Sequence, residues 1–216
     1  DDLTNLSLLK KFASTNLPII LSSGMSTLNE ISDALGTVGF SSGYPTILLV
    51  TTSQYPTPPE DVNLIKFYIL SKKFPGLPLG FSDHTVGHLA SSLACVLGAV
   101  FLEKHFTLNK NLPGPDHWFS EDPKSLKDWV SSIRIAHELL GSGELQPTKN
   151  ELKMKILARR SLEALKNIKK GDLFDQNNVG MKRPGDGLEP KIFFNLKGRK
   201  SKRDISKGTQ LKKGDF

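Results

Sequence analysis

The sequence predicts an α/β protein with a parallel sheet, followed by a small, loop-rich second domain. The first 140 residues contain four short apolar runs, each followed by a polar loop and a helix-like stretch. Strand–helix units in series form parallel sheets with right-handed crossovers, and four such units are half of a (β/α)8 barrel. After residue 141, short strand-like runs alternate with Lys-Gly and Pro-Gly turns, which is typical of a compact domain rich in turns.

The individual elements follow from periodicity and turn signals. A helical stripe over 6–15 precedes the first unit, and Thr27 with Glu30 has the spacing of a capping box at the start of the next helix. The predicted strands are 17–21, 46–50, 77–81 and 99–102, and the predicted helices are 27–38, 60–74, 86–97 and 123–140. The second part has strand-like runs at 161–165 and 179–181. We therefore divide the chain into a partial barrel domain (1–145), a linker (146–157) and a second domain (158–216).

Charge and composition exclude several classes of protein. The net charge is +7, and 16 basic against 7 acidic residues lie in 159–216, which leaves 13 against 15 in the rest. These basic residues alternate with glycines and acids and have few aromatic neighbours, so we expect no nucleic-acid binding. The sequence has no apolar run long enough for a membrane span. Its one cysteine, Cys95, suits a reducing cytoplasm, and the start on Asp1 without a methionine suggests a fragment or a processed product.

Two histidines follow strands of the predicted sheet and form the main candidate site. His84 lies in Gly80-Phe-Ser-Asp-His-Thr85 and His105 lies in Glu103-Lys-His-Phe-Thr107. The carboxyl ends of parallel strands meet at one edge of a sheet, where ligands bind. Two imidazoles there are candidate ligands of a divalent metal with open positions for substrate, although each could equally be a structural, hydrogen-bonded histidine. A loop with two prolines holds Asp116 near the same edge.

The polar loop after the first strand is a second candidate. Ser22, Ser23 and Gly24 lie between an apolar run and the start of a helix. Backbone N–H groups and the helix dipole favour anions at such a position, so the loop is a candidate phosphate site. Its alternative interpretation is a simple helix cap.

Seven motifs in order resemble those of the sialic acid synthases, the enzymes that make N-acetylneuraminate and related nonulosonic acids. They are LSSGMSTL (21–28), YPTP (55–58), GFSDHT (80–85), EKHFT (103–107), GPDH (114–117), RRSL (159–162) and KRPG (182–185). The resemblance covers almost the whole chain. It implies that the chain contains the last four βα units of a TIM (β/α)8 barrel, followed by a β-rich antifreeze-like domain (SAF domain, β-clip fold).

The resemblance also implies a reaction, a metal and a set of site residues. Phosphoenolpyruvate condenses with an N-acylated hexose of the N-acetylmannosamine type, and phosphate leaves by C–O cleavage. His84 and His105 match ligands of a Mn²⁺ or Mg²⁺ ion, and Ser22 and Ser82 match residues that hold phosphoenolpyruvate. Tyr55 matches a sugar-site tyrosine, Asp116 matches an acid near the sugar hydroxyls, and Asp2 matches a substrate-binding acid after the fourth strand. Ser53 stands where some members have Asn, and Arg183 matches an arginine that reaches the N-acyl group in the partner subunit of a domain-swapped homodimer.

The resemblance leaves the sugar and the activity of this chain open. The family's glutamate and lysines of the first four strands have no counterpart in the sequence, so we expect the 216 residues alone to bind metal weakly and to turn over slowly or not at all. Alternatives are a synthase for legionaminic or pseudaminic acid, an enzyme of spore-coat polysaccharide synthesis, and a non-catalytic sugar-binding or scaffold protein.

Overall fold

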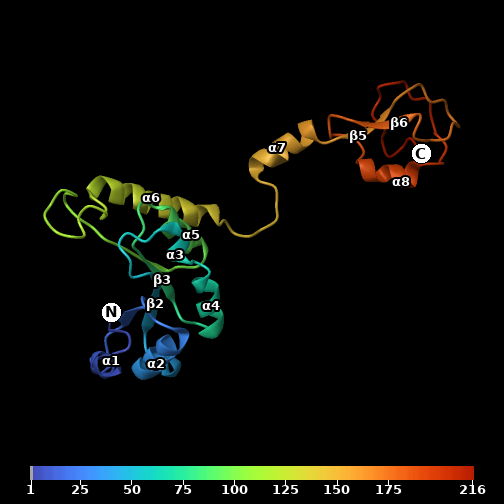
Figure 1. Ribbon diagram of the computed structural model, residues 1–216. Coiled ribbons are helices and arrows are strands. Elements are labelled where there is room, and N and C mark those ends of the chain that lie inside the picture. Colours follow the sequence, from blue (N-terminus) through green and yellow to red (C-terminus); the bar gives the residue numbers. More distant parts are fainter. Residues whose placement is uncertain (1) are drawn as a thin grey trace. The chain divides into compact units, whose positions relative to one another are not determined.

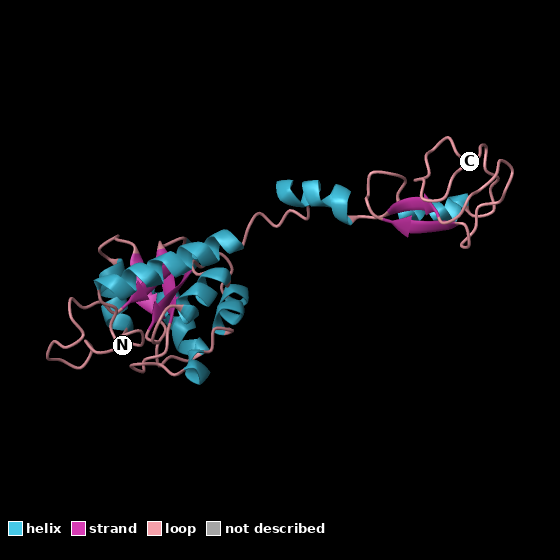
Figure 2. Cartoon of the chain, turned by 90° about the horizontal axis from the view of Figure 1, so that it is seen from above, coloured by secondary structure: helices cyan, strands magenta, loops and turns pink. Residues whose placement is uncertain are grey.

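A computed structural model describes residues 2–216 (Figure 1). The chain divides into two compact units, Asp1–Gly143 and Glu144–Phe216. The first unit contains a four-stranded sheet and the second a two-stranded sheet (Figure 2). Each unit has a hydrophobic core of its own, so the two are described separately.

The sheet of the first unit is parallel throughout. Its strands are β1 (Ile19–Ser22), β2 (Thr46–Val50), β3 (Leu79–Asp83) and β4 (Phe101–Lys104), and they lie side by side in chain order (Figure 1). Neighbouring parallel strands in sequence order require helical crossovers between them. The predicted parallel α/β fold is thereby confirmed.

The helices of this unit largely follow the predicted pattern. They are α1 (Leu6–Ala13), α2 (Leu28–Val38), α3 (Pro59–Val62), α4 (Lys66–Lys73), α5 (Leu89–Val96) and α6 (Pro123–Leu139), with a short 3-10 turn at Phe40–Ser42. The capping box of Thr27 and Glu30 is present, and Cys95 is buried in α5. One expectation is wrong: the single helix predicted for 60–74 is interrupted, because Asn63 adopts a left-handed conformation with φ 50°. No helix within residues 2–216 has the length and apolar character needed to cross a bilayer.

Strands β3 and β4 extend two residues beyond their predicted ends. The prediction stopped where the apolar runs stop, but the ladder continues through the polar pairs Ser82 with Glu103 and Asp83 with Lys104. These polar residues stay in the strands because their side chains find partners on both sides of the sheet. Successive strand residues point to opposite faces, so the extension decides which face each polar side chain occupies.

Burial differs between the central and the edge strands. All five residues of β3 are buried, whereas β4 alternates between exposed and half-buried residues. The residues of one face of β4, Phe101 and Glu103, are the exposed ones, and we call this the inner face of the sheet. The opposite, outer face is covered by helices: Asp83 contacts Ser91 of α5, and Ser91 contacts Trp129 of α6.

The second unit contains little regular structure. Strands β5 (Ser161–Ala164) and β6 (Val179–Lys182) are antiparallel, and further bridges join 163 to 210, 168 to 205 and 173 to 200. A 3-10 turn (Pro190–Ile192) and α8 (Phe193–Leu196) complete the unit, whose core includes Leu162, Phe174 and Ile205. The segment predicted as a linker contains a helix, α7 (Lys149–Ala158), which begins with a capping box of Thr148 and Glu151 that the sequence analysis overlooked.

Candidate functional site

The inner face of β3 and β4 carries the candidate site at its carboxyl end. Ser82 of β3 and Glu103 of β4 lie on this face, because alternate strand residues share a face, and His84 and His105 directly follow the ends of the two strands. The hydroxyl of Ser82 donates to Glu103 Oε1 at 2.6 Å. The rings of His84 and His105 lie edge to face with centroids 5.4 Å apart. The two predicted histidines are therefore neighbours.

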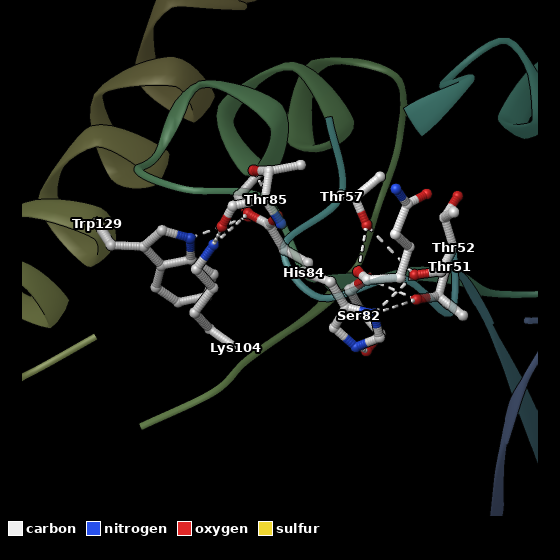
Figure 3. Close-up of polar contacts among 11 residues, drawn as sticks. Thr51, Thr52, Thr57, Ser82, His84, Thr85, Lys104 and Trp129 are labelled. Carbon is white, nitrogen blue, oxygen red and sulfur yellow. Dashed lines mark hydrogen bonds and ion pairs between the residues drawn. The ribbon is translucent and has the colours of Figure 1, made fainter. Parts of the chain in front are cut away.

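The hydrogen bonds of His84 define its tautomer. Nδ1 lies 2.7 Å from the carbonyl oxygen of Thr52, which can only accept, so Nδ1 carries a proton (Figure 3). Nε2 lies 3.2 Å from Ser82 Oγ, but the single proton of that hydroxyl goes to Glu103. In the neutral ring, Nε2 therefore presents its lone pair to an oxygen that has no proton left to offer.

The environment keeps this ring neutral. Burial lowers the pKa of His84 below its ordinary value of 6.5, and the neighbouring His105 ring lowers it further, although the hydrogen bond to Thr52 acts in the opposite direction. The neutral imidazole is the form that binds a metal. A backbone carbonyl on Nδ1 is also the usual arrangement that orients Nε2 of a metal-binding histidine.

Aromatic side chains cover the two histidines. The ring of Tyr55 lies 4.2 Å from that of His84 and 5.3 Å from that of His105, measured between centroids. Phe119 lies 5.2 Å from His105 and is buried. These rings pack against the two histidines, and Tyr55 is itself exposed, so a ligand can reach it.

The donor set fits a divalent cation held partly by the protein. Nε2 of His84 lies 3.2 Å from the oxygen of Ser82, and the ring of His105 lies beside that of His84. Within residues 2–216, however, no three or more His, Cys, Asp or Glu side chains are grouped so as to hold a metal ion. The described side chains of these four types therefore offer at most two ligands at one place, and the remaining positions would belong to substrate and water, as a Lewis-acid site requires.

Two further predicted residues, Ser22 and Ser53, lie at the end of β1 and in the loop after β2. Ser22 is the last residue of β1 and is exposed. A Cβ built on Gly24 would lie 2.2 Å from Ser53 Oγ and 3.1 Å from Thr51 Cγ2, so the loops after β1 and β2 approach each other closely at this glycine. Ser23 is occupied internally, since its hydroxyl donates to Leu49 O at 2.9 Å.

Three other predicted site residues are not among the contacts that define this cluster. Asp116 is exposed in the loop between β4 and α6, and its carbonyl accepts hydrogen bonds from Ser120. Asp2 is exposed before α1. Arg183 belongs to the second unit, where Nε donates to Ala158 O at 2.9 Å. Their predicted roles rest on the resemblance alone.

The sequence reasoning missed two members of the cluster. Glu103 was treated as part of a motif, although its spacing of two residues from His105 places both on one face once β4 is extended to Lys104. Phe119 gave no usable signal, because it contacts His105 through a loop whose course the sequence does not specify.

The fold agrees with the comparisons to known proteins. Residues 1–145 match the model of the NeuB family, and residues 159–216 match that of the SAF domain. The chain therefore belongs to the NeuB family of sialic acid synthases and carries a SAF domain.

Three individual relatives illustrate this similarity. The chain is 42% identical over 97% of its length to the N,N'-diacetyllegionaminic acid synthase of Legionella pneumophila, and 37% identical over 100% to the pseudaminic acid synthase of Helicobacter pylori. It spans 60% and 63% of those proteins. The crystal structure of the spore coat polysaccharide biosynthesis protein SpsE of Bacillus subtilis matches 99% of the chain and 65% of its own, at 33% identity and a TM-score of 0.61.

Proposed function

We propose that this chain is the carboxy-terminal part of a nonulosonic acid synthase that condenses phosphoenolpyruvate with an N-acylated hexose. The observation that carries the proposal is the convergence of His84, Ser82, Glu103 and His105 on the inner face of the sheet. In the reaction, C3 of phosphoenolpyruvate bonds to the aldehyde carbon, water adds at C2, and the bond from C2 to the phosphate oxygen breaks.

The residues of the first unit have distinct tasks in this reaction. Ser22 and Ser82 hold the phosphate or carboxylate of phosphoenolpyruvate by hydrogen bonds, and for this Ser82 turns its proton away from Glu103 and toward the ligand. His84 and His105 hold the Mn²⁺ or Mg²⁺ ion, which supplies electrophilic stabilisation of the aldehyde oxygen. Glu103 accepts the Ser82 proton at 2.6 Å and thereby turns the serine oxygen toward Nε2 of His84.

The sugar is bound by a second group of residues. The ring of Tyr55 lies tilted against both imidazoles, and its hydroxyl contacts the sugar together with Ser53 of the same loop. Asp116 and Asp2 accept hydrogen bonds from sugar hydroxyls. Arg183 contacts the N-acyl group across a domain-swapped homodimer.

The remainder of the barrel belongs to the same proposal. β1 and β4 each pair on one side in the sheet of residues 2–216, and the inner residues Phe101 and Glu103 are exposed. Four further βα units would pair both edges and cover this face, closing a (β/α)8 barrel. Such an enzyme would work in the cytoplasm, where phosphoenolpyruvate is available.

Phosphate release tests this function. The 216-residue chain and a chimera that carries the amino-terminal part of the Legionella pneumophila relative are each incubated with phosphoenolpyruvate, Mn²⁺, and either N-acetylmannosamine or a di-N-acetylated hexosamine. We expect turnover by the chimera, and slow turnover or none by the chain alone. The proposal would be contradicted by a chimera that folds and binds Mn²⁺ but does not release phosphate with either sugar. The sugar that gives the faster turnover distinguishes a neuraminate synthase from a legionaminate-type synthase. His84→Ala with His105→Ala in the chimera is the control, since it should abolish turnover.

A further inference from the structure

The outer face of β3 and β4 carries a buried ion pair directly behind the candidate site. Asp83 and Lys104 are paired in the strand register, and each immediately precedes one of the two histidines. Lys104 Nζ lies 3.2 Å from Asp83 Oδ2, and the side chains are 3% and 0% exposed. Figure 3 shows Lys104, Thr85 and Trp129 on one side and the contacts of His84 with Ser82, Thr51 and Thr52 on the other.

Every oxygen of Asp83 is occupied. Oδ1 accepts from the backbone N–H and the hydroxyl of Thr85, both at 2.8 Å. Oδ2 accepts from Ser91 Oγ at 2.5 Å and faces Lys104. Trp129 Nε1 donates to Ser91 Oγ at 3.0 Å, so the network joins β3 and β4 to α5 and α6.

The network holds the backbone around His84 from both sides. Asp83 precedes His84 and accepts two hydrogen bonds from Thr85, which follows it. Lys104 donates to the carbonyl of Thr85, so β4 is tied to the turn that follows His84. The carbonyl of His84 itself accepts from Thr57 N at 2.9 Å. His84 is therefore held relative to β4, the strand that leads into His105.

Stability is a poor explanation for such a pair. Replacing a buried ion pair by apolar residues of similar volume is often neutral or stabilising, because two charges must be desolvated. A buried, fully satisfied polar network does specify one arrangement of the elements it joins. The arrangement specified here is the spacing and register of two strands at the point where each delivers an imidazole.

We infer that Asp83 and Lys104 are positioning residues that set the mutual placement of the His84 and His105 rings. The inference rests on the proposed function for its purpose, since a two-imidazole metal site needs both rings fixed. Neither residue touches substrate or metal in this scheme, and both act through the backbone of the histidine that follows them.

The direct test is NMR of the metal-free chain. The two rings, 5.4 Å apart, should give mutual ring-proton NOEs and distinct imidazole ¹⁵N shifts. In the variant Asp83→Asn with Lys104→Met, which keeps the volume and removes both charges, we expect these NOEs to be lost and the shifts to change. The matched control is Leu35→Ala, a core variant in α2, which lowers thermal stability but should leave the ring signals unchanged.

Retention of the wild-type NOEs and shifts in the double variant would overturn the inference. If the double variant does not fold, Ser91→Ala removes one donor to Asp83 and leaves the ion pair in place, and Lys104→Arg retains the charge. Ser91→Ala should shift the ring signals in part. Lys104→Arg, tested as a single variant, should give the same ring signals as the wild type. Unchanged signals in Ser91→Ala would also overturn the inference.

Mn²⁺ binding, followed by the electron paramagnetic resonance signal of the free ion, separates the inference from the proposed function. We expect the double variant to bind Mn²⁺ about 10- to 100-fold more weakly than the wild type, as for other groups that orient a metal ligand. Wild-type affinity in the double variant would count against the inference. Equal binding by the wild type and His84→Ala would defeat the proposed metal site, while the ring NOEs would still decide the positioning role.

Discussion

The two faces of β3 and β4 carry polar residues of similar kind but in opposite states. On the outer face, Asp83 and Lys104 are buried and satisfy each other together with Thr85 and Ser91. On the inner face, Ser82 and Glu103 satisfy each other, but Nε2 of His84 keeps an unused lone pair. A network in which every polar atom has a partner fixes one structure. A network with an unused lone pair, such as that on Nε2 of His84, can also bind a ligand.

The largest effect should come from breaking the closed network on one side only. Lys104→Met leaves the carboxylate of Asp83 buried without its counter-charge, which costs about 3–5 kcal/mol of unfolding free energy. Urea unfolding followed by tryptophan fluorescence measures it, because both tryptophans, Trp118 and Trp129, lie in the first unit. The companion change Asp83→Asn should recover part of the loss, and a double variant as unstable as the single one would show that charge is not the cause.

Removal of the imidazole nitrogens of His84 and His105 should instead affect the binding of Mn²⁺. His84→Ala with His105→Ala should weaken Mn²⁺ binding by on the order of 100-fold or more, since loss of a ligand exceeds loss of a group that orients one. Isothermal titration with Mn²⁺ measures this. The unfolding transition should change far less than in Lys104→Met, and intact Mn²⁺ affinity would assign the ion to other residues.

The same substitution on each face gives a closer comparison. Ser91→Ala removes hydrogen bonds to Asp83 and from Trp129 and should cost about 1–3 kcal/mol, because buried partners are left unsatisfied. Ser82→Ala should cost less, since Glu103 is exposed and water can replace the hydroxyl, but it should weaken phosphoenolpyruvate binding about 10-fold. Urea denaturation and titration with phosphoenolpyruvate of both variants measure these two effects. Equal losses of phosphoenolpyruvate binding in Ser91→Ala and Ser82→Ala would contradict the prediction.

The smallest effect is a pH dependence of stability in the metal-free protein. Burial lowers the pKa of His84 in the folded chain below 6.5, so below pH 6.5 the unfolded chain binds more protons than the folded one. The free energy of unfolding should therefore decrease as the pH falls from 6.5 toward the folded pKa. The urea midpoint at pH 7.0 and 5.5 measures it, and His84→Gln should show a weaker dependence.

The sequence predicts the sheet well because its signals are local. β2 matches its predicted bounds, 46–50, since an apolar run between turn residues defines it. The capping box at Thr27 is likewise a local hydrogen-bond pattern. The break at Asn63 was missed because a left-handed residue inside a helical pattern leaves little trace in sequence.

The site could be predicted only in part. His84 and His105 were found from their place after apolar runs, and the structure brings them together. The sequence does not predict the roles of Glu103 and the pair of Asp83 and Lys104, because apolar runs end before these polar residues, whereas partners from other elements keep them in the ladder. Such partners come from residues far along the chain, so hydrophobic periodicity does not reveal them.

Gly80 lies one step below Ser82 on the inner face of β3. A Cβ there would lie 2.4 Å from Leu49 Cδ2 and 2.7 Å from the carbonyl oxygen of Phe101. The neighbouring strands thus fill the space that a side chain would occupy, and they form an apolar floor beneath the serine and the glutamate. In evolutionary terms, position 80 should be among the least substitutable in the chain, because any larger residue would displace the Leu49 side chain and the Phe101 backbone next to Ser82 and Glu103.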